Sequence, residues 1–394
     1  MDKIRYLRWL CLTALLDSDN TDEPPGTMPL TDELVHYACR HGLAPLLWRR
    51  LLKLDPRHPD LRLMTEAVTD DGLPPVSRKP LSSLLRESYL STLLRNLQIQ
   101  KTLRELDDAL QQTGIPCLVW KGAAISAMVY GGMGLRPMDD IDLLVPEIHW
   151  QALIPVLNQI GFSRRPDYPL TWHRGPMVID LHGDITHSDR IPARRKALAL
   201  NTGTLLSRAA AFPGYSHLVM PSPFDALLCL AANAMKHGFS KDIWIVDMFL
   251  LFDRFPELSS SPRRLAADAG EAGASLPLFL LFKCAESWPR RLNPDPIGEL
   301  EISRRAAAFS RFVSRAGLRL PNEGELYYLL MMKSPRDLMA YLRDTFFPSR
   351  QVMKQLYPGK PMGCYWLYYP NRHMRLAIKL FQGLASMVPG GRQR

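Results

Sequence analysis

The sequence predicts an α+β protein in which a small mixed sheet is flanked by an N-terminal and a C-terminal helical region. Apolar residues recur at three- and four-residue steps up to about residue 112 and again after residue 221, as on packed helices. Between these regions, short apolar runs closed by glycines are typical of strands and turns. The chain has 394 residues, 46% of them hydrophobic, which is enough for two or three cores. We expect a helical region at 1–112, an α/β core at 113–200 and a helical region at 201–394.

The N-terminal region has its clearest helical pattern from about Leu81 to Gln112, and Gly114 follows as a C-cap. Acidic and proline-rich breaks at 17–25 and 70–75 separate this helix from the chain before it. The first residues resemble a signal peptide only weakly, because their apolar run is about eight residues long and lacks a small-residue cleavage site. We therefore expect an amphipathic helix there.

The central region alternates short strands with short helices. Strands are predicted at 115–120, 139–145, 172–174 and 177–182, and helices at 123–130 and 147–160. Gly175-Pro176 lies between the last two strands and indicates a hairpin. The order of elements is that of a small α/β unit.

The C-terminal region begins with a well-formed helix start. Ser222 is a cap, Pro223 occupies the first helical position and Asp225 the third. We expect this helix to end near Gly238 and a very apolar one to follow from about Ile243.

Charge is concentrated at the end of the chain. The net charge is +10, and residues 301–394 hold 16 Lys or Arg against 5 Asp or Glu. This basic segment is compatible with binding to nucleic acid or an anionic membrane surface, with steering of an anionic substrate, or with an ordinary solvated surface, which we favour.

Cysteine spacing and hydropathy exclude other classes of protein. The six cysteines show no CxxC or Cys/His spacing, which argues against a zinc ribbon or a disulfide scaffold. No stretch approaches the ~20 apolar residues of a membrane span. We expect a cytoplasmic protein without a transmembrane segment.

Asp140-Ile141-Asp142 is the most informative tripeptide in the chain. On a strand, residues i and i+2 point to the same face, so the two carboxylates lie side by side. Their flanks are apolar, and two buried like charges are costly unless a cation lies between them. Mg²⁺ bound by one or two carboxylates together with substrate phosphates is the usual solution.

Two neighbouring features favour a site over an acidic pair that is merely exposed at a strand end. Lys121-Gly122 closes a strand and opens a helix, where backbone N–H groups and a cation can receive phosphate. Asp180 is a third acid on a hydrophobic strand. The order is glycine turn, paired acids, single acid.

At these residues the sequence resembles the nucleotidyltransferase superfamily, whose fold is that of DNA polymerase beta. The segments 118–122, 135–145 and 179–182 are similar to a narrower family of largely uncharacterised bacterial nucleotidyltransferases with a helical tail, and Lys236-His237-Gly238 looks like its downstream motif. The resemblance covers roughly residues 30–380, and its specific signal lies in 115–183.

The resemblance implies roles for the acids and the glycine turn. Asp140, Asp142 and Asp180 would be catalytic and would hold Mg²⁺ (or Mn²⁺), two ions by analogy, with Asp180 also helping to deprotonate the acceptor hydroxyl. Gly122 would let the backbone approach the triphosphate. Ala123 departs from the superfamily, which usually has Ser or Gly there, and the gap between Gly122 and Asp140 is longer than usual.

Four further residues are candidates for the site. Lys121 could neutralise the triphosphate and Arg136 could clamp a γ-phosphate, although both could be ordinary surface cations. His182 shares a face with Asp180 and could contact the metal or the acceptor, and His237 could belong to a helix face over the nucleotide. A structural histidine is favoured in both cases.

Asp247 lies in the very apolar helix that follows and needs a partner. Lys236, His237 and Arg254 are the partners expected from sequence position, and we interpret this acid as structural.

Taken together, these residues predict transfer of a nucleoside monophosphate from an NTP, by default ATP, to a hydroxyl-bearing acceptor with release of pyrophosphate. The acceptor could be a small molecule, a peptide or a protein. An RNA-modifying enzyme that uses the basic C-terminal helices is an alternative, and nucleic acid is not the favoured partner. A non-catalytic nucleotide-binding or scaffold protein of the same fold is the other alternative.

Overall fold

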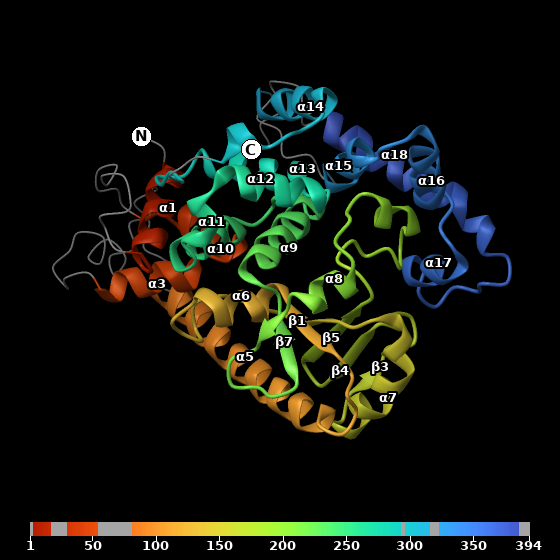
Figure 1. Ribbon diagram of the computed structural model, residues 1–394, viewed down its shortest axis with the longest axis horizontal. Helices are drawn as coiled ribbons and strands as arrows, with labels where there is room; N and C mark the ends of the chain where they lie inside the picture. Colours follow the sequence, from red (N-terminus) through yellow and green to blue (C-terminus); the bar gives the residue numbers. More distant parts are fainter. Residues whose placement is uncertain (1–2, 17–29, 54–80, 293–295, 316–322, 386–394) are drawn as a thin grey trace, which may run out of the picture.

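In the computed structural model, a seven-stranded mixed sheet is flanked by helices from both ends of the chain (Figure 1). The described residues are 3–16, 30–53, 81–292, 296–315 and 323–385. The predicted α+β class is confirmed. The breaks expected at 17–25 and 70–75 lie outside the described residues.

The N-terminal helices pack against one another, and α5 also packs onto the sheet. They are α1 (Lys3–Thr13), α2 (Asp32–Arg40), α3 (Ala44–Lys53) and α5 (Leu81–Leu110). The expected amphipathic helix at the N-terminus is confirmed as α1, whose Leu7 and Leu10 are buried. Helix α5 has the predicted bounds to within two residues and runs along the sheet (Figure 1).

The sheet has the strand order β3-β4-β5-β2-β1-β7-β6. Its strands are β1 (Cys117–Trp120), β2 (Ile141–Leu144), β3 (Ser163–Arg164), β4 (Thr171–Arg174), β5 (Met177–His182), β6 (Ala210–Ala211) and β7 (Leu218–Met220). Strand β2 runs parallel to β5 and antiparallel to β1, while β1 is parallel to β7. The predicted hairpin is confirmed as β4–β5. Strands β6 and β7 lie beyond residue 200, so the sheet extends past the 113–200 core that the sequence suggests.

Short helices connect these strands. They are α6 (Lys121–Val129), the 3₁₀ turn η2 (Glu147–His149), α7 (Trp150–Gln159), the 3₁₀ turn η3 (Pro192–Lys196) and α8 (Thr202–Ser207). The single helix predicted at 147–160 is thus a 3₁₀ turn followed by an α-helix. Strand β2 begins at Ile141, so Asp140 precedes the strand instead of lying within it.

The remaining helices form the C-terminal region. They are α9 (Pro223–Lys236), α10 (Ile243–Arg254), α11 (Glu257–Ser260), α12 (Pro262–Glu271), α13 (Ser275–Ala285), η4 (Ile297–Glu299), α14 (Arg304–Arg315), α15 (Glu323–Met331), α16 (Pro335–Phe346), α17 (Arg350–Leu356), η5 (Tyr365–Tyr368) and α18 (Tyr369–Ala385). The predicted cap is confirmed, since the Ser222 hydroxyl accepts from the Asp225 N–H.

The two faces of the sheet enter different cores. Val119, Leu143 and Ile179 pack with α5 and α7 in one core. Leu118, Trp120 and Leu144 on the opposite face belong to a second core with α6, α9 and α10. A third core joins η3 to α13, α15 and α16. None of the described helices is long and apolar enough to cross a membrane.

Candidate functional site

The three acids meet on the sheet face that carries Trp120. Trp120 of β1 pairs with Asp142 of β2, and Asp142 pairs with Asp180 of β5. Residues directly opposite each other on neighbouring strands point to the same face. Asp140 joins them from just before β2, and one carboxylate oxygen of each acid lies within 4.8 Å of the others. The structure therefore brings together all three acids that the sequence singled out.

The three carboxylates are not equivalent. Burial, and then the charge of Asp142, raise the pKa of Asp140 to about 7. Burial acts in the same direction on Asp142, but Lys121 and His182 outweigh it and hold the pKa of Asp142 well below its usual range. Oδ1 of Asp180 is buried and has no hydrogen-bond partner in the described part of the chain. The cluster thus holds more negative charge than its protein neighbours compensate.

Lys121 turns toward the acids. Its Nζ lies 2.5 Å from Asp142 Oδ1 and 4.4 Å from the centroid of the Trp120 ring. Lys121 has a φ of 51°, a conformation that is uncommon for a residue other than glycine, at the point where β1 ends and α6 begins. No side chain caps the N-terminus of α6. The backbone N–H groups of this turn remain available to an anion beside the Lys121 ammonium.

Gly122 is packed too closely for any other residue. A β-carbon at position 122 would lie 2.8 Å from Arg136 Nη1 and 3.1 Å from Met138 Cγ. Glycine is therefore required by the approach of Arg136, whether or not phosphate also approaches this turn.

Arg136 is not an ordinary surface cation. It is buried, and its Nε and Nη2 form a bidentate ion pair with Asp247 of α10 at 2.7 to 3.1 Å. Tyr130 donates a further hydrogen bond to Asp247 at 2.8 Å. The partner of Asp247 is thus Arg136 and none of Lys236, His237 or Arg254, because the loop before β2 packs against α10. Only Nη1 of Arg136, next to Gly122, remains without a carboxylate partner in the described residues.

His182 is tied to the acid cluster, whereas His237 is not. Nε2 of His182 lies 2.8 Å from Asp142 Oδ1, and burial lowers the pKa of this histidine, so the neutral ring donates to the carboxylate. His237 caps the C-terminus of α9 beside Trp244, with ring centroids 5.9 Å apart. Among the described residues, His237 forms no hydrogen bond with any of the three acids.

Two residues of the site escape sequence reasoning. His187 has a φ of 55°, its ring lies 4.6 Å from that of His182, and its buried Nε2 has no partner in the described residues. Lys236 is largely buried, and burial followed by the positive charges of Lys121, Arg194 and Arg190 lowers its pKa to about 7. No carboxylate of the described residues forms an ion pair with Lys236. A lysine directly before the His237-Gly238 helix end is the one sequence signal that could have identified it.

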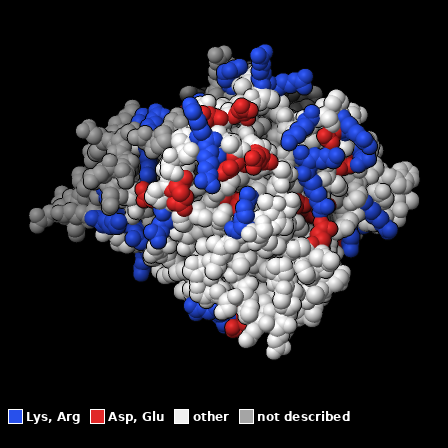
Figure 2. Space-filling view, viewed as in Figure 1, with Lys and Arg blue, Asp and Glu red and all other residues white. Residues whose placement is uncertain are grey.

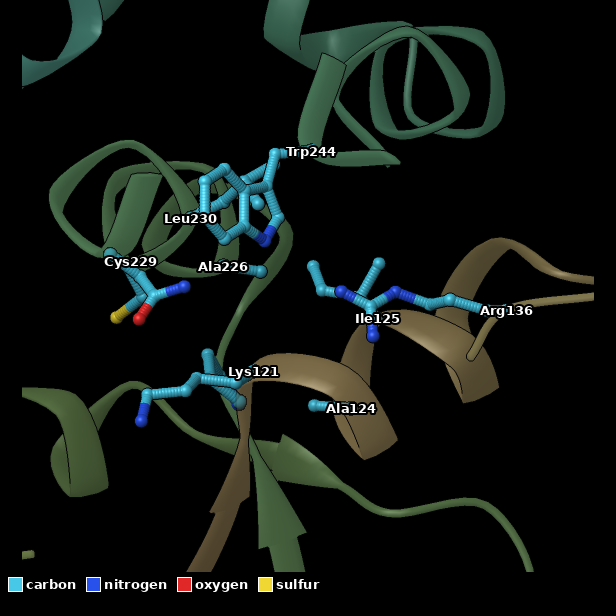
Figure 3. A pocket seen from close by; sticks show the side chains of 10 residues that line it. Lys121, Ala124, Ile125, Arg136, Ala226, Cys229, Leu230 and Trp244 are labelled. Carbon is cyan, nitrogen blue, oxygen red and sulfur yellow. The ribbon is translucent and has the colours of Figure 1, made fainter. Parts of the chain in front are cut away.

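The cavity between α6, α9 and α10 is too small for a nucleotide. It has a volume of about 20 Å³, which is roughly the space of one water molecule. Figure 3 shows that Lys121 extends away from Arg136 and Trp244, which line the far side of this cavity.

Comparison with known proteins agrees with this geometry. The model of a family described as "Uncharacterised nucleotidyltransferase" matches residues 30–289. The chain belongs to this nucleotidyltransferase family. The match includes the acids, the glycine turn and helices α9 and α10. Comparisons with curated proteins and with solved structures found no match.

Proposed function

We propose that this protein is a metal-dependent nucleotidyltransferase that moves a nucleoside monophosphate from an NTP, by default ATP, to a hydroxyl-bearing acceptor. The observation that carries the proposal is the convergence of Asp140, Asp142 and Asp180 on one sheet face, with more negative charge than their neighbours compensate. Membership of the nucleotidyltransferase family supports the class of reaction.

The three carboxylates suit Mg²⁺ or Mn²⁺. Both cations prefer oxygen ligands, and one oxygen of each acid lies within 4.8 Å of the others. Oδ1 of Asp142 is occupied by Lys121 and His182, which leaves its second oxygen for a cation. Oδ1 of Asp180 has no competing partner in the described residues. Such a metal would neutralise the phosphates and lower the pKa of the acceptor hydroxyl.

Other residues of the chain would bind the leaving pyrophosphate and accept the acceptor's proton. The backbone N–H groups at Gly122 and the Lys121 ammonium lie on the side where the pyrophosphate would leave, and Lys236 is close enough for the charge of Lys121 to lower its pKa. The acceptor oxygen forms the new bond to the α-phosphorus as the bond to the bridging oxygen breaks, and pyrophosphate takes that electron pair. Asp180 lies on the side of Asp142 that is away from Lys121. There it would accept the proton of the acceptor hydroxyl.

Calorimetric titration with NTP tests the proposal directly. Binding should require Mg²⁺ and should be lost in Asp142→Asn, since this variant lacks the central carboxylate. A scaffold protein without a working site would bind neither NTP nor Mg²⁺. Incubation with each α-labelled NTP and Mg²⁺ in cell extract should then transfer label to an acceptor, and absence of both binding and transfer would refute the proposal.

A further inference from the structure

Trp120, Asp142 and Asp180 lie opposite one another on neighbouring strands and form a row across the sheet. This row continues beyond Asp180. Asp180 of β5 pairs with Thr171 of β4, and the Thr171 carbonyl accepts the backbone N–H of Arg165, directly after β3. Lys121 lies at the opposite end of the row, beyond Asp142. Because attacking and leaving oxygens lie in line, the acceptor must approach from the Thr171 side if pyrophosphate leaves beside Lys121. This step rests on the function proposed above.

A groove begins where that row ends. It has a volume of about 760 Å³, within the size range of ligand sites. One wall is the loop after β3, and the other is α17 with the turn that follows it. The lining residues are Pro166, Asp167, Pro169, Arg350, Gln351, Lys354, Lys360 and Met362.

The two walls are joined by a hydrogen bond. The Tyr168 hydroxyl donates to the Gln355 carbonyl of α17 at 3.1 Å. The guanidinium carbons of Arg165 and Arg190 lie 5.2 and 5.9 Å from the centroid of the Tyr168 ring. Two cations therefore lie at Tyr168, beside the contact that joins the two walls.

The cations of this region fall into two groups. Arg194, Arg195 and Lys196 of η3 each form an ion pair with a carboxylate. Arg350 and Lys360, which line the groove, and Arg165 and Arg190, which lie near Tyr168, form no ion pair with the described residues. In the groove itself, Asp167 is the only acid against three cations, and it lies 3.8 Å from Lys354.

The position of Arg350 does not favour the stability of the fold. It is the first residue of α17, where the helix dipole disfavours a positive charge. Figure 2 shows Lys and Arg side chains over the C-terminal helices, with Asp and Glu among them and further Lys and Arg over other parts of this face. The groove thus holds two cations that form no ion pair with the described residues, Arg350 of α17 and Lys360 of the turn after it, and two further arginines lie at Tyr168 beside it. Such an arrangement suits a ligand with several negative charges.

We propose that the acceptor carries phosphate groups, and that these bind in the groove between the 166–169 loop and α17 while the acceptor hydroxyl reaches Asp180. Phosphate fits better than a single carboxylate, because it offers several oxygens to planar guanidinium groups and carries more charge. A phosphorylated small molecule and the end of a single-stranded RNA share this chemistry.

The test compares two double variants that remove equal charge. Arg350→Gln/Lys360→Gln changes the groove, and Arg263→Gln/Arg264→Gln changes two arginines of α12 whose side chains are 87% and 83% exposed. Transfer from α-labelled NTP is measured against cell-extract concentration. The groove variant should raise the apparent KM for extract by about tenfold or more, with NTP binding unchanged, because phosphate contacts are charge-assisted. The α12 variant should behave as wild type.

Pretreatment of the extract distinguishes the two sources of phosphate. Immobilised phosphatase, removed before NTP is added, should abolish labelling of a phosphorylated small molecule, and ribonuclease should abolish labelling of RNA. Labelling that resists both treatments, or a groove variant that transfers as wild type does, overturns the inference. A wild-type protein that binds no NTP and labels nothing refutes the proposed function, and this inference falls with it.

Discussion

Without metal, Asp140→Asn should make the protein more stable at pH 8. The structure raises the pKa of Asp140 to about 7, chiefly by burial and then by the charge of Asp142. Each pKa unit corresponds to about 1.4 kcal/mol, so the ionised carboxylate costs at most about 4 kcal/mol. Asp140 is partly exposed, and solvent screening should reduce the gain to about 1–2 kcal/mol.

The sign of the pH dependence is fixed by the direction of this pKa. An unfolded aspartate ionises near pH 4, whereas folded Asp140 stays protonated up to about pH 7. The cost therefore grows as the pH rises from 4 to 7 and is complete above 7. The stability gain of the variant should be close to zero at pH 4.5 and full at pH 8.

Urea unfolding in EDTA at both pH values measures this difference. Asp139→Asn is the matched control, because the neighbouring carboxylate is exposed and should change stability by less than about 0.5 kcal/mol. Mg²⁺ should stabilise the wild type by mass action and reverse the order of the two proteins. An Asp140→Asn protein that is less stable than wild type at pH 8 in EDTA would refute the reasoning.

Three other variants test separate parts of the structure. Asp180→Ala should lower single-turnover transfer on the order of 10²–10⁴-fold, yet leave NTP binding nearly intact, and unchanged transfer would show that another acid takes the proton. Arg136→Met should destabilise by about 3–5 kcal/mol in urea unfolding, because it leaves the fully buried Asp247 unpaired, and a loss below 1 kcal/mol would contradict this. Asp242→Asn removes a buried carboxylate whose pKa is held below its usual range, against the effect of burial, by a hydrogen bond from His41 and then by its ion pair with Arg8. The variant's free energy of unfolding should be lower than that of the wild type by a constant amount above pH 4, and the difference should shrink as the pH falls below 4. A difference that does not change with pH would argue against the ion pair.

Much of the sheet and the acid cluster can be predicted from sequence because local patterns encode them. Alternation on a strand predicts that the side chains of Asp140 and Asp142 point the same way, and the order of the glycine turn and the acids resembles that of the family. The helix start at Ser222 follows directly from capping chemistry.

The parts that sequence reasoning missed depend on contacts between distant segments. Strand β7 joins the sheet by pairing with β1 about 100 residues earlier, and its three residues are too short for a clear pattern. Arg136 meets Asp247 only because α10 packs over the loop before β2. Lys236 belongs to a motif that the sequence shows, but its lowered pKa comes from burial and from the charges of Lys121, Arg194 and Arg190, which are distant in the sequence.

The central claim is transfer of a nucleoside monophosphate at the three acids, and the fate of two differently labelled NTPs tests it most directly. With wild-type protein, Mg²⁺ and cell extract, α-labelled NTP should transfer its label to the acceptor, while γ-labelled NTP should release its label as pyrophosphate in equal amount. Asp142→Asn should do neither. Transfer of the γ label, or label transfer that persists in Asp142→Asn, would contradict the account.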